Sequence, residues 1–346
     1  MWLPLLWDPG VYPVLAHRYL MINGFAGCFI GGFLMTAVPK FSQTESAKLS
    51  EILMLLLVTI AGLIFAYQEN EQLVFISSSL QPLVLLIFLF RRIFKRKQNP
   101  PYSFVFIFVG LFLWMLSGLG SAFIDPETFK HLHYEGAISA IILGVGSRLI
   151  PGILGHVEIV KLQKQKYEQL IPIIKTVPLT FAALIMIFII SYFIGGMTGD
   201  MVRGGVVAII GMMYWKLYSS PKDKTALTWS IWTASWLIVL SFILKALWQD
   251  GMIHVTHSFF INGIVLLSLL IGTRVLQSHG PQDKTLEDSK VLYVVTGFVV
   301  FAAATRVSAY LLPKVYLTHL SYSALMLVLA VAIWSIKYLR YISRYH

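Results

Sequence analysis

Apolar stretches of roughly 20 residues follow one another along the whole chain and are separated by short polar breaks. A helix of about 20 apolar residues crosses the hydrocarbon core of a bilayer, because it rises about 1.5 Å per residue. The clearest breaks are 91–101, 161–167 and 219–225, and no separate soluble domain is visible between them. The pattern therefore predicts one all-α polytopic transmembrane bundle of eleven helices, formed by residues 1–346 as a single domain. We place these helices near residues 13–38, 48–67, 71–92, 101–123, 129–152, 177–196, 200–217, 227–248, 252–276, 290–311 and 318–340.

The distribution of basic residues predicts the orientation of the bundle. If the N-terminus lies outside, nineteen of the 27 Lys and Arg residues fall in inner loops and the C-terminal tail. Three fall in the outer loops, namely Lys130, Arg203 and Lys314, and the other five fall inside the spans or at their edges. Cytoplasmic loops of membrane proteins carry an excess of Lys and Arg. We therefore predict the N-terminus outside and the C-terminus inside.

Composition agrees with a membrane protein and excludes other classes. Hydrophobic residues make up 57% of the chain and charged residues 12%, whereas a soluble domain carries about 25% charged residues. The formal net charge is +11, but the basic residues lie between apolar spans, so topology explains the charge better than nucleic-acid binding does. The single cysteine, Cys28, excludes an internal disulfide and an all-cysteine metal site within the chain. The expected partner is the lipid bilayer, with no nucleic acid.

Histidines gather at the predicted outer ends of the odd-numbered helices. Six of the nine histidines lie there. Imidazole is a common ligand for iron, copper and zinc, so six histidines at one depth suit a metal or haem site inside a bundle. The alternative is that each histidine anchors its helix at the lipid headgroups. The six residues are His17, His131, His133, His254, His257 and His319.

The spacing of these histidines predicts which of them share a helix face. His254 and His257 are three residues apart and therefore lie on one face. His131 and His133 are two residues apart and do not share a face. Only one of this second pair is expected to point into the bundle, while the other lies on the cap or supports a ligand.

Arginines inside the spans mark two levels of the predicted bundle, because charges in a membrane usually face the protein interior. Arg18 and Arg306 lie toward the outer side, where they are placed to pair with haem propionates. Two other arginines each follow a histidine by 17 residues, about 25 Å along a helix, and so lie near the inner ends. With the histidines beside them they either form a second, inner site or extend to the inner headgroups. This inner set is Arg148, His156, Arg274 and His279.

Small residues interrupt the first predicted helix at Gly24, Gly27, Gly31 and Gly32. They allow helices to approach closely, and they would equally make room for a flat cofactor. The chain has no Walker loop, dinucleotide fingerprint, nucleophile elbow or C-x-x-C-H motif. Any haem is therefore expected to be b-type, without covalent attachment through a C-x-x-C-H motif.

Three separated segments resemble signatures of the NnrS family. The segment 31–42, GGFLMTAVPKFS, with His17 seven residues before Gly24, resembles the first signature. The segments 131–156 and 257–280 resemble the two later signatures, each with a His, a Gly-containing helix, an Arg and a downstream Gly-His element. Together they cover about 75 residues, in the order that the family has.

The family is described as bacterial inner-membrane proteins that contain haem and copper and are linked to nitric oxide metabolism, denitrification and tolerance of nitrosative stress. On that resemblance His17, His131 and His257 match motif histidines, and two of them hold the haem iron. The inner set matches the inner elements of the family's signatures. The resemblance therefore implies haem b as cofactor, with copper as a second metal.

Topology alone adds three histidines that support a second metal or a water, namely His133, His254 and His319. The chain also departs from the family's pattern. Tyr19 and Leu20 stand where the first motif commonly has a second His followed by Glu, and Lys-Phe-Ser-Gln at 40–43 replaces Asn-Trp-Thr-Gly. These losses bear on whether both metals and a redox activity are retained.

Three functional interpretations follow. The first is a haem-binding inner-membrane protein that senses, binds or turns over nitric oxide or a related diatomic, with a redox partner that the sequence does not specify. The second is a transporter or assembly factor that passes copper or haem across the membrane, which the parallel repeat of the fifth and ninth helices favours. The third is a structural subunit whose histidines are only interfacial anchors.

Overall fold

The computed structural model describes residues 13–158, 161, 173–279 and 286–341, and within these ranges the fold consists of helices without any strand. A helix satisfies its own backbone hydrogen bonds, which a segment inside a bilayer requires. Each of the eleven predicted helices is present, and its ends lie within four residues of the predicted ones. The prediction of an all-helical fold is therefore confirmed.

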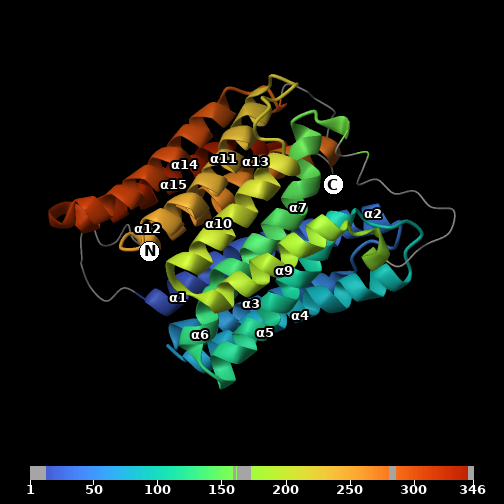
Figure 1. Ribbon diagram of the computed structural model, residues 1–346, viewed down its shortest axis with the longest axis horizontal. Helices are drawn as coiled ribbons and strands as arrows, with labels where there is room; N and C mark the ends of the chain where they lie inside the picture. The colour runs from blue at the N-terminus through green and yellow to red at the C-terminus, as the bar shows by residue number, and fades with distance from the viewer. Residues whose placement is uncertain (1–12, 159–160, 162–172, 280–285, 342–346) are drawn as a thin grey trace. The chain divides into compact units, whose positions relative to one another are not determined.

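The described residues group into two compact units. The N-terminal unit comprises Pro13–Leu149 and Val157–Phe193, and the C-terminal unit comprises Ile150–His156 and Ile194–His346. In Figure 1 the helices of the first unit run from blue to yellow-green, and those of the second run mainly from yellow to red. The assignment of residues 1–346 to one transmembrane domain stays a prediction.

The N-terminal unit is organised around α4, which packs along both α3 and α5. Its first helix is continuous and has three parts, α1 (Val14–Tyr19), the π-helical segment η2 (Leu20–Gly27) and α2 (Cys28–Ser42). A second continuous helix also contains a π-helical segment and consists of α6 (Pro126–His131), η4 (Leu132–Gly136) and α7 (Ala137–Ile153). The other elements are α3 (Leu49–Tyr67), α4 (Glu71–Phe94), η3 (Tyr102–Phe104), α5 (Val105–Phe123), η5 (Ile173–Thr176) and α9 (Leu179–Ile194).

The C-terminal unit is built from helix pairs, because α10 packs along α11 and α14 packs along α15. A third continuous helix with a π-helical segment consists of α12 (Met252–Phe259), η6 (Phe260–Leu266) and α13 (Leu267–His279). Its α12 part packs against both α11 and α14. The other elements are α10 (Gly196–Met213), α11 (Ala226–Leu247), α14 (Val291–Ser308), η8 (Ala309–Leu311), η9 (Pro313–Val315), α15 (Tyr316–Tyr338) and η10 (Leu339–Tyr341).

Two of the four glycines in the first helix explain how closely its neighbours approach. A Cβ atom at Gly27 would lie 2.5 Å from Oε1 of Gln81 in α4, and a Cβ atom at Gly31 would collide with Leu55 of α3. The Cβ of a residue at Gly32 would meet nothing within 4 Å. Gly27 and Gly31 are therefore the small residues that helix packing requires.

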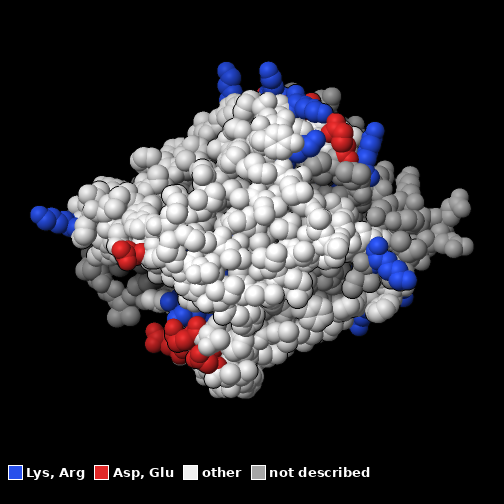
Figure 2. All heavy atoms as spheres, in the orientation of Figure 1, with Lys and Arg blue, Asp and Glu red and all other residues white. Residues whose placement is uncertain are grey.

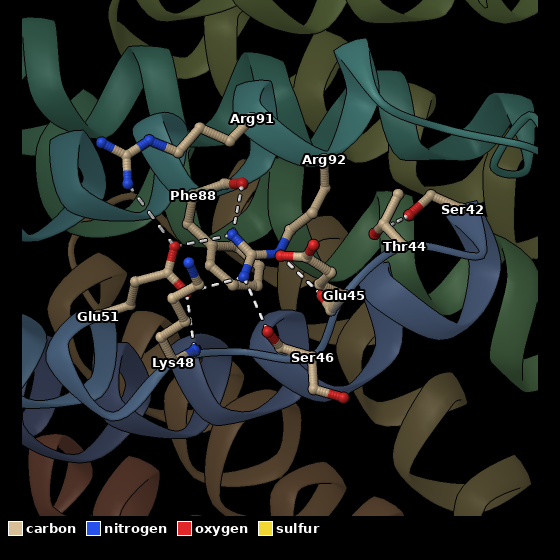
Figure 3. A network of polar contacts seen from close by, with 9 residues as sticks. All are labelled: Ser42, Thr44, Glu45, Ser46, Lys48, Glu51, Phe88, Arg91 and Arg92. Atoms are coloured by element: carbon tan, nitrogen blue, oxygen red, sulfur yellow. Dashed lines mark hydrogen bonds and ion pairs between the residues drawn. The ribbon is translucent and has the colours of Figure 1, made fainter.

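A buried ion pair joins the start of α3 to the end of α4 (Figure 3). Arg92 donates to both carboxylate oxygens of Glu51, at 2.8 and 2.7 Å. It also donates to the backbone carbonyls of Glu45 and Ser46. Its guanidinium carbon lies 3.6 Å from the centroid of the Phe88 ring. Because a bidentate Arg–carboxylate pair has a fixed geometry, the loop between α2 and α3 is held against α4.

Nine of the described helices are long and apolar enough to cross a membrane. The two other predicted spans coincide with α9, which has 16 residues, and with α10, which carries Asp200 and Arg203. On the face drawn in Figure 2, charged side chains lie at the periphery and uncharged residues cover the centre. The chain is thus a multi-pass membrane protein. The number of eleven crossings and the orientation stay predictions.

The structure corrects one assignment behind the predicted orientation. Arg203, which was expected in an outer loop, lies inside α10 and is 6% exposed. Its guanidinium donates to Oδ1 of Asp200 at 2.6 Å, and Nζ of Lys245 lies 3.6 Å from the same oxygen. Gln249 donates to the other carboxylate oxygen of Asp200 at 3.2 Å. Arg203 lies inside the helix because a buried guanidinium is tolerated when a carboxylate pairs with it.

Candidate functional site

Each of the three π-helical segments follows closely after a histidine. η2 begins three residues after His17, η4 directly after His131, and η6 three residues after His257. Two of these segments contain the same Ile-Asn-Gly sequence, at 22–24 and 261–263. Single π-helical turns inside α-helices occur frequently at functional sites. The surroundings of these segments therefore define the candidate site in each unit.

In the N-terminal unit, His133 of η4 is fully buried and both of its ring nitrogens have protein partners. Nε2 lies 2.8 Å from Oγ of Ser78, and Nδ1 lies 3.1 Å from the carbonyl of Trp114 and 3.3 Å from Oγ of Ser117. Ser78 also donates to Oδ1 of Asn23 at 2.8 Å, which links the imidazole to Asn23. Both ring nitrogens thus have partners within the unit, and the role of His133 as a metal ligand stays a prediction.

The partners of His133 belong to a larger set of buried polar groups. Nδ2 of Asn23 donates to Oε1 of Gln81 at 2.8 Å, and Nε2 of Gln81 donates to the Asn23 carbonyl at 3.0 Å. The same Nε2 donates to Oγ1 of Thr59 at 2.9 Å, and Thr59 donates to the carbonyl of Leu55 at 2.8 Å. Each group is buried and hydrogen-bonded, as polar groups inside an apolar bundle must be. We call this set, Asn23, Thr59, Ser78, Gln81 and His133, the buried polar network.

The other outer residues of this unit lie nearer its surface. His17 is half-buried in α1, whereas Arg18 beside it is exposed. His131 is the last residue of α6 and is exposed, while His133 is buried. The prediction that only one histidine of this pair points inward is confirmed, and the inward one is His133.

In the C-terminal unit, His254 of α12 is 5% exposed and is bound by Arg306 of α14. Nη1 of Arg306 lies 2.6 Å from Nδ1 of His254. The same Nδ1 lies 3.2 Å from the backbone carbonyl of Arg306, so both the guanidinium and the carbonyl of this arginine face one ring nitrogen. The ring centroids of Tyr310 and Tyr316 lie 5.5 and 5.8 Å from that of the imidazole. Arg306 therefore fixes the orientation of the His254 ring, which also packs against the rings of Tyr310 and Tyr316.

Two further histidines of this unit are also bonded through Nδ1. Nδ1 of His257 lies 2.7 Å from the carbonyl of Ile253 and donates to it. Nδ1 of His319 lies 3.1 Å from Oγ of Ser308, whose own proton goes to the carbonyl of Thr305 at 3.0 Å. Both histidines therefore donate from Nδ1 and carry their lone pair on Nε2. A histidine that binds a metal has this arrangement, because its second nitrogen is usually anchored by a hydrogen bond.

The described contacts do not assemble the predicted inner set into one site. Arg148 is half-buried in α7, and its Nε has no hydrogen-bond partner among the described residues. His156 is 1% exposed and belongs to the C-terminal unit. Arg274 of α13 pairs with Glu287. His279 ends α13, and its side chain lies outside the described part of the structure.

The donor set of the described residues fits a haem better than a protein-only metal centre. Within the described ranges, no three His, Cys, Asp or Glu side chains lie close enough together to hold a metal ion. A haem needs only one or two protein ligands, since the porphyrin supplies the other four. His257 and His319 have the tautomer that such a ligand requires. Copper, which needs several protein ligands, finds less support in the same residues.

Sequence reasoning missed the polar partners that hold the histidines. These partners come from transmembrane helices in which hydroxyl and amide side chains attract little notice beside charged ones. Two signals were available, namely the repeated Ile-Asn-Gly at 22–24 and 261–263 and the polar run Ser-Ser-Ser-Leu-Gln at 77–81. The overlooked residues are Asn23, Ser78, Gln81, Thr59, Asp200 and Asn262.

Comparison with known proteins finds one match, and it covers essentially the full length of the chain. The family model described as NnrS protein matches residues 1–345. No curated protein and no solved structure matches the chain. The three segments 31–42, 131–156 and 257–280 are thus parts of one continuous family match. The chain belongs to the NnrS family.

Proposed function

We propose that this chain is a haem-binding protein of the bacterial inner membrane that binds, senses or turns over nitric oxide or a related diatomic. Family membership supports the link to nitric oxide, and nine apolar helices of sufficient length support the membrane location. The observation that carries the haem proposal is the tautomer of His257 and His319, which place a lone pair on Nε2. Anchoring of Nδ1 in this way is typical of histidines that bind a metal.

His257 is the proposed ligand of the haem iron, because its ring is anchored to the carbonyl of Ile253 by Nδ1–H. His17 and His131 of the N-terminal unit stay the haem-binding candidates that the sequence predicts. His319 is the proposed support for a second metal or a water, for which the described residues give less support than for the haem. A bound haem would supply an iron at which a diatomic coordinates and which changes its redox state.

Other outer residues position this site. Arg306 contributes a buried positive charge beside His254, and such a charge attracts the propionates of a haem strongly because the surroundings are poorly polarisable. Arg18 of the N-terminal unit stays the propionate-binding candidate that the sequence predicts. His254, whose Nδ1 faces Arg306, is the proposed support for a second metal or a bound water. His133 is a positioning residue within the buried polar network.

The test is an optical spectrum of the purified full-length protein, air-oxidised and dithionite-reduced, with iron and copper counted in the same sample. We expect a b-type band in the reduced protein, about one iron per chain, and a shift of the reduced spectrum when nitric oxide is added. His257→Ala should lose the band because the iron loses its proposed ligand. His346→Ala at the end of the chain is the matched control and should keep it.

Two outcomes would contradict these assignments separately. Full haem content in His257→Ala would reject this residue as the ligand while leaving haem binding intact. A colourless wild-type protein after haem-replete expression would reject the proposed function itself.

A transporter or assembly factor for copper or haem is the second candidate. The ionic cluster of Asp200, Arg203 and Lys245 in α10 and α11 favours it, because ionisable side chains inside a membrane often line substrate or ion pathways. Vesicles containing the protein would then accumulate the metal, and Asp200→Asn would abolish this movement. If the protein is instead a haem protein of the first kind, Asp200→Asn keeps the reduced spectrum and the vesicles accumulate nothing.

A further inference from the structure

Asn262 lies in the π-helical segment η6 and is 1% exposed, yet its Oδ1 has no hydrogen-bond donor among the described residues. Its other side-chain atom is satisfied, since Nδ2 donates to Oγ of Ser258 at 3.2 Å. Nine-tenths or more of buried polar groups in proteins have a partner. A buried amide oxygen without a protein donor therefore points to a ligand that donates to it.

Nearby hydroxyl groups do not serve as this donor. Ser241 of α11 donates to the carbonyl of Leu237 at 2.7 Å and contacts Oγ of Ser258 at 3.2 Å. None of these bonds ends on Oδ1 of Asn262. Ser241, Ser258 and Asn262 thus form a cluster that joins α11 to the helix containing η6. Oδ1 of Asn262 remains without a donor among the described residues.

In the N-terminal unit, the asparagine of the same Ile-Asn-Gly sequence has a hydrogen-bond donor for its side-chain oxygen. Asn23 occupies the middle of Ile-Asn-Gly in η2, as Asn262 does in η6. Oδ1 of Asn23 accepts a hydrogen bond from Ser78 of α4 at 2.8 Å. In the described part of the C-terminal unit no side chain takes the place of Ser78. The missing donor at Asn262 is therefore specific to this unit.

The charges around Asn262 decide what kind of donor fits. Arg306 is bonded to His254, which lies one helical turn before Ser258. Lys245 lies one turn after Ser241 in α11 and is 5% exposed. Lys245 pairs with Asp200, so the charge that disfavours a further cation here comes from the guanidinium of Arg306. An anion is also disfavoured, because an amide oxygen offers it only a lone pair.

We propose that Oδ1 of Asn262 binds a small neutral molecule that donates a hydrogen bond, which in the resting protein is a water held beside Ser258. His254, Ser258 and Asn262 follow one another at intervals of four residues and form a polar stripe along α12 and η6. The bound water extends this stripe from the predicted outer end of the helix toward its middle. The site is independent of the proposed haem function, because it needs no metal ligand.

The direct test is a structure of the full-length protein in lipid nanodiscs that shows ordered water. We expect a water within about 3 Å of Oδ1 of Asn262. A protein donor found at that oxygen overturns the proposal.

The second test compares two variants by their thermal midpoints of unfolding. Asn262→Leu removes the acceptor and fills its space, so loss of a bound water should lower Tm by about 2–4 °C. Ser258→Ala is the comparison variant, since it removes the hydroxyl that is bonded to Nδ2 of Asn262 and to Ser241 but keeps Oδ1. A fall in Tm that is larger for Asn262→Leu than for Ser258→Ala supports the bound donor. An unchanged or raised Tm in Asn262→Leu would mean that Oδ1 is unpaired, and that result overturns it.

A third measurement distinguishes water from an alkali cation. Tm of the wild-type protein should be the same in sodium and in choline buffers of equal ionic strength. A Tm that rises with sodium in the wild-type protein but not in Asn262→Leu would show a cation site and contradict the neutral donor.

Discussion

The two units hold their buried histidines in different ways, although both place Ile-Asn-Gly in a π-helical segment that follows a histidine. In the N-terminal unit, neutral amides and hydroxyls enclose His133 and both of its nitrogens are in use. In the C-terminal unit, a guanidinium binds His254, and two neighbouring histidines keep their Nε2 lone pairs. The first unit uses its polar groups for its own packing, whereas the second leaves the buried Oδ1 of Asn262 without a donor among the described residues.

The physical difference lies in whether hydrogen-bond donors and acceptors balance within the protein. Buried polar networks rigidify a fold when every member is satisfied, and partly satisfied ones require an additional partner. The buried polar network is balanced, because Ser78 and Gln81 of α4 complete the bonds of Asn23. Around Asn262 the balance is incomplete. Ligand chemistry is therefore expected in the C-terminal unit.

Among the variants that test this difference between the units, Gly27→Ala is expected to lower stability most. It would disturb the buried polar network of the N-terminal unit. The new Cβ would lie 2.5 Å from Oε1 of Gln81, and Gln81 cannot move without breaking its bonds to Asn23 and Thr59. Overpacking together with lost hydrogen bonds should lower the free energy of unfolding by about 2–3 kcal/mol. Thermal unfolding of the detergent-solubilised protein measures this loss.

Gly32→Ala is the matched control for this variant, since a Cβ there meets nothing within 4 Å. It should leave stability unchanged or raise it slightly, because alanine favours a helix over glycine. Equal loss of stability in both variants would show that helix propensity, rather than contact with Gln81, determines the result.

An intermediate effect is expected from Arg306→Met, which would disturb the C-terminal unit. The variant removes the donor to Nδ1 of His254, and a hydrogen bond to a charged group contributes about 1.5–3 kcal/mol. Thermal unfolding should show a loss of about 2 kcal/mol. The exposed Arg18 provides the control, and Arg18→Met should change stability by less than about 0.5 kcal/mol. If Arg306→Met is as stable as the wild type, the guanidinium does not hold His254.

The smallest effect on stability is expected from Asp125, the N-cap residue of α6, which precedes His131 and His133 in the chain. Asp125 caps α6 by accepting from the backbone N–H groups of Glu127 and Thr128. Hydrogen bonds from the side chain and then the backbone of Thr128 lower the pKa of Asp125 below its ordinary carboxyl range. The lowered pKa means that the cap stabilises the folded state at neutral pH, and that this contribution disappears as the pH falls through the folded-state pKa.

The variant Asp125→Asn sharpens this last test because asparagine can cap a helix but does not titrate. A small loss of stability with acidification below pH 4 should therefore occur in the wild type and be reduced in Asp125→Asn, as measured by thermal unfolding across that range. The same acid-dependent loss in both proteins would show that other carboxylates cause it.

The sequence alone determined the helices of this protein and the kind of environment that surrounds them. Length and hydropathy located all eleven helices to within four residues, because an apolar run of that length has few alternatives to a helix in a membrane. The three family-like segments likewise lay within a match that covers residues 1–345. Spacing also showed that His131 and His133 cannot both face inward.

Only the tertiary structure decided which polar groups meet. Ser78 donates to the side-chain oxygen of Asn23, although the two residues are 55 positions apart in the chain. No local sequence pattern reveals such a pair. For the same reason the sequence did not show that Arg203 pairs with Asp200 and lies buried inside α10. Hydrophobic periodicity encodes burial along a helix, whereas hydrogen-bond partners depend on how separate helices pack side by side. The chemistry of each histidine followed from that packing.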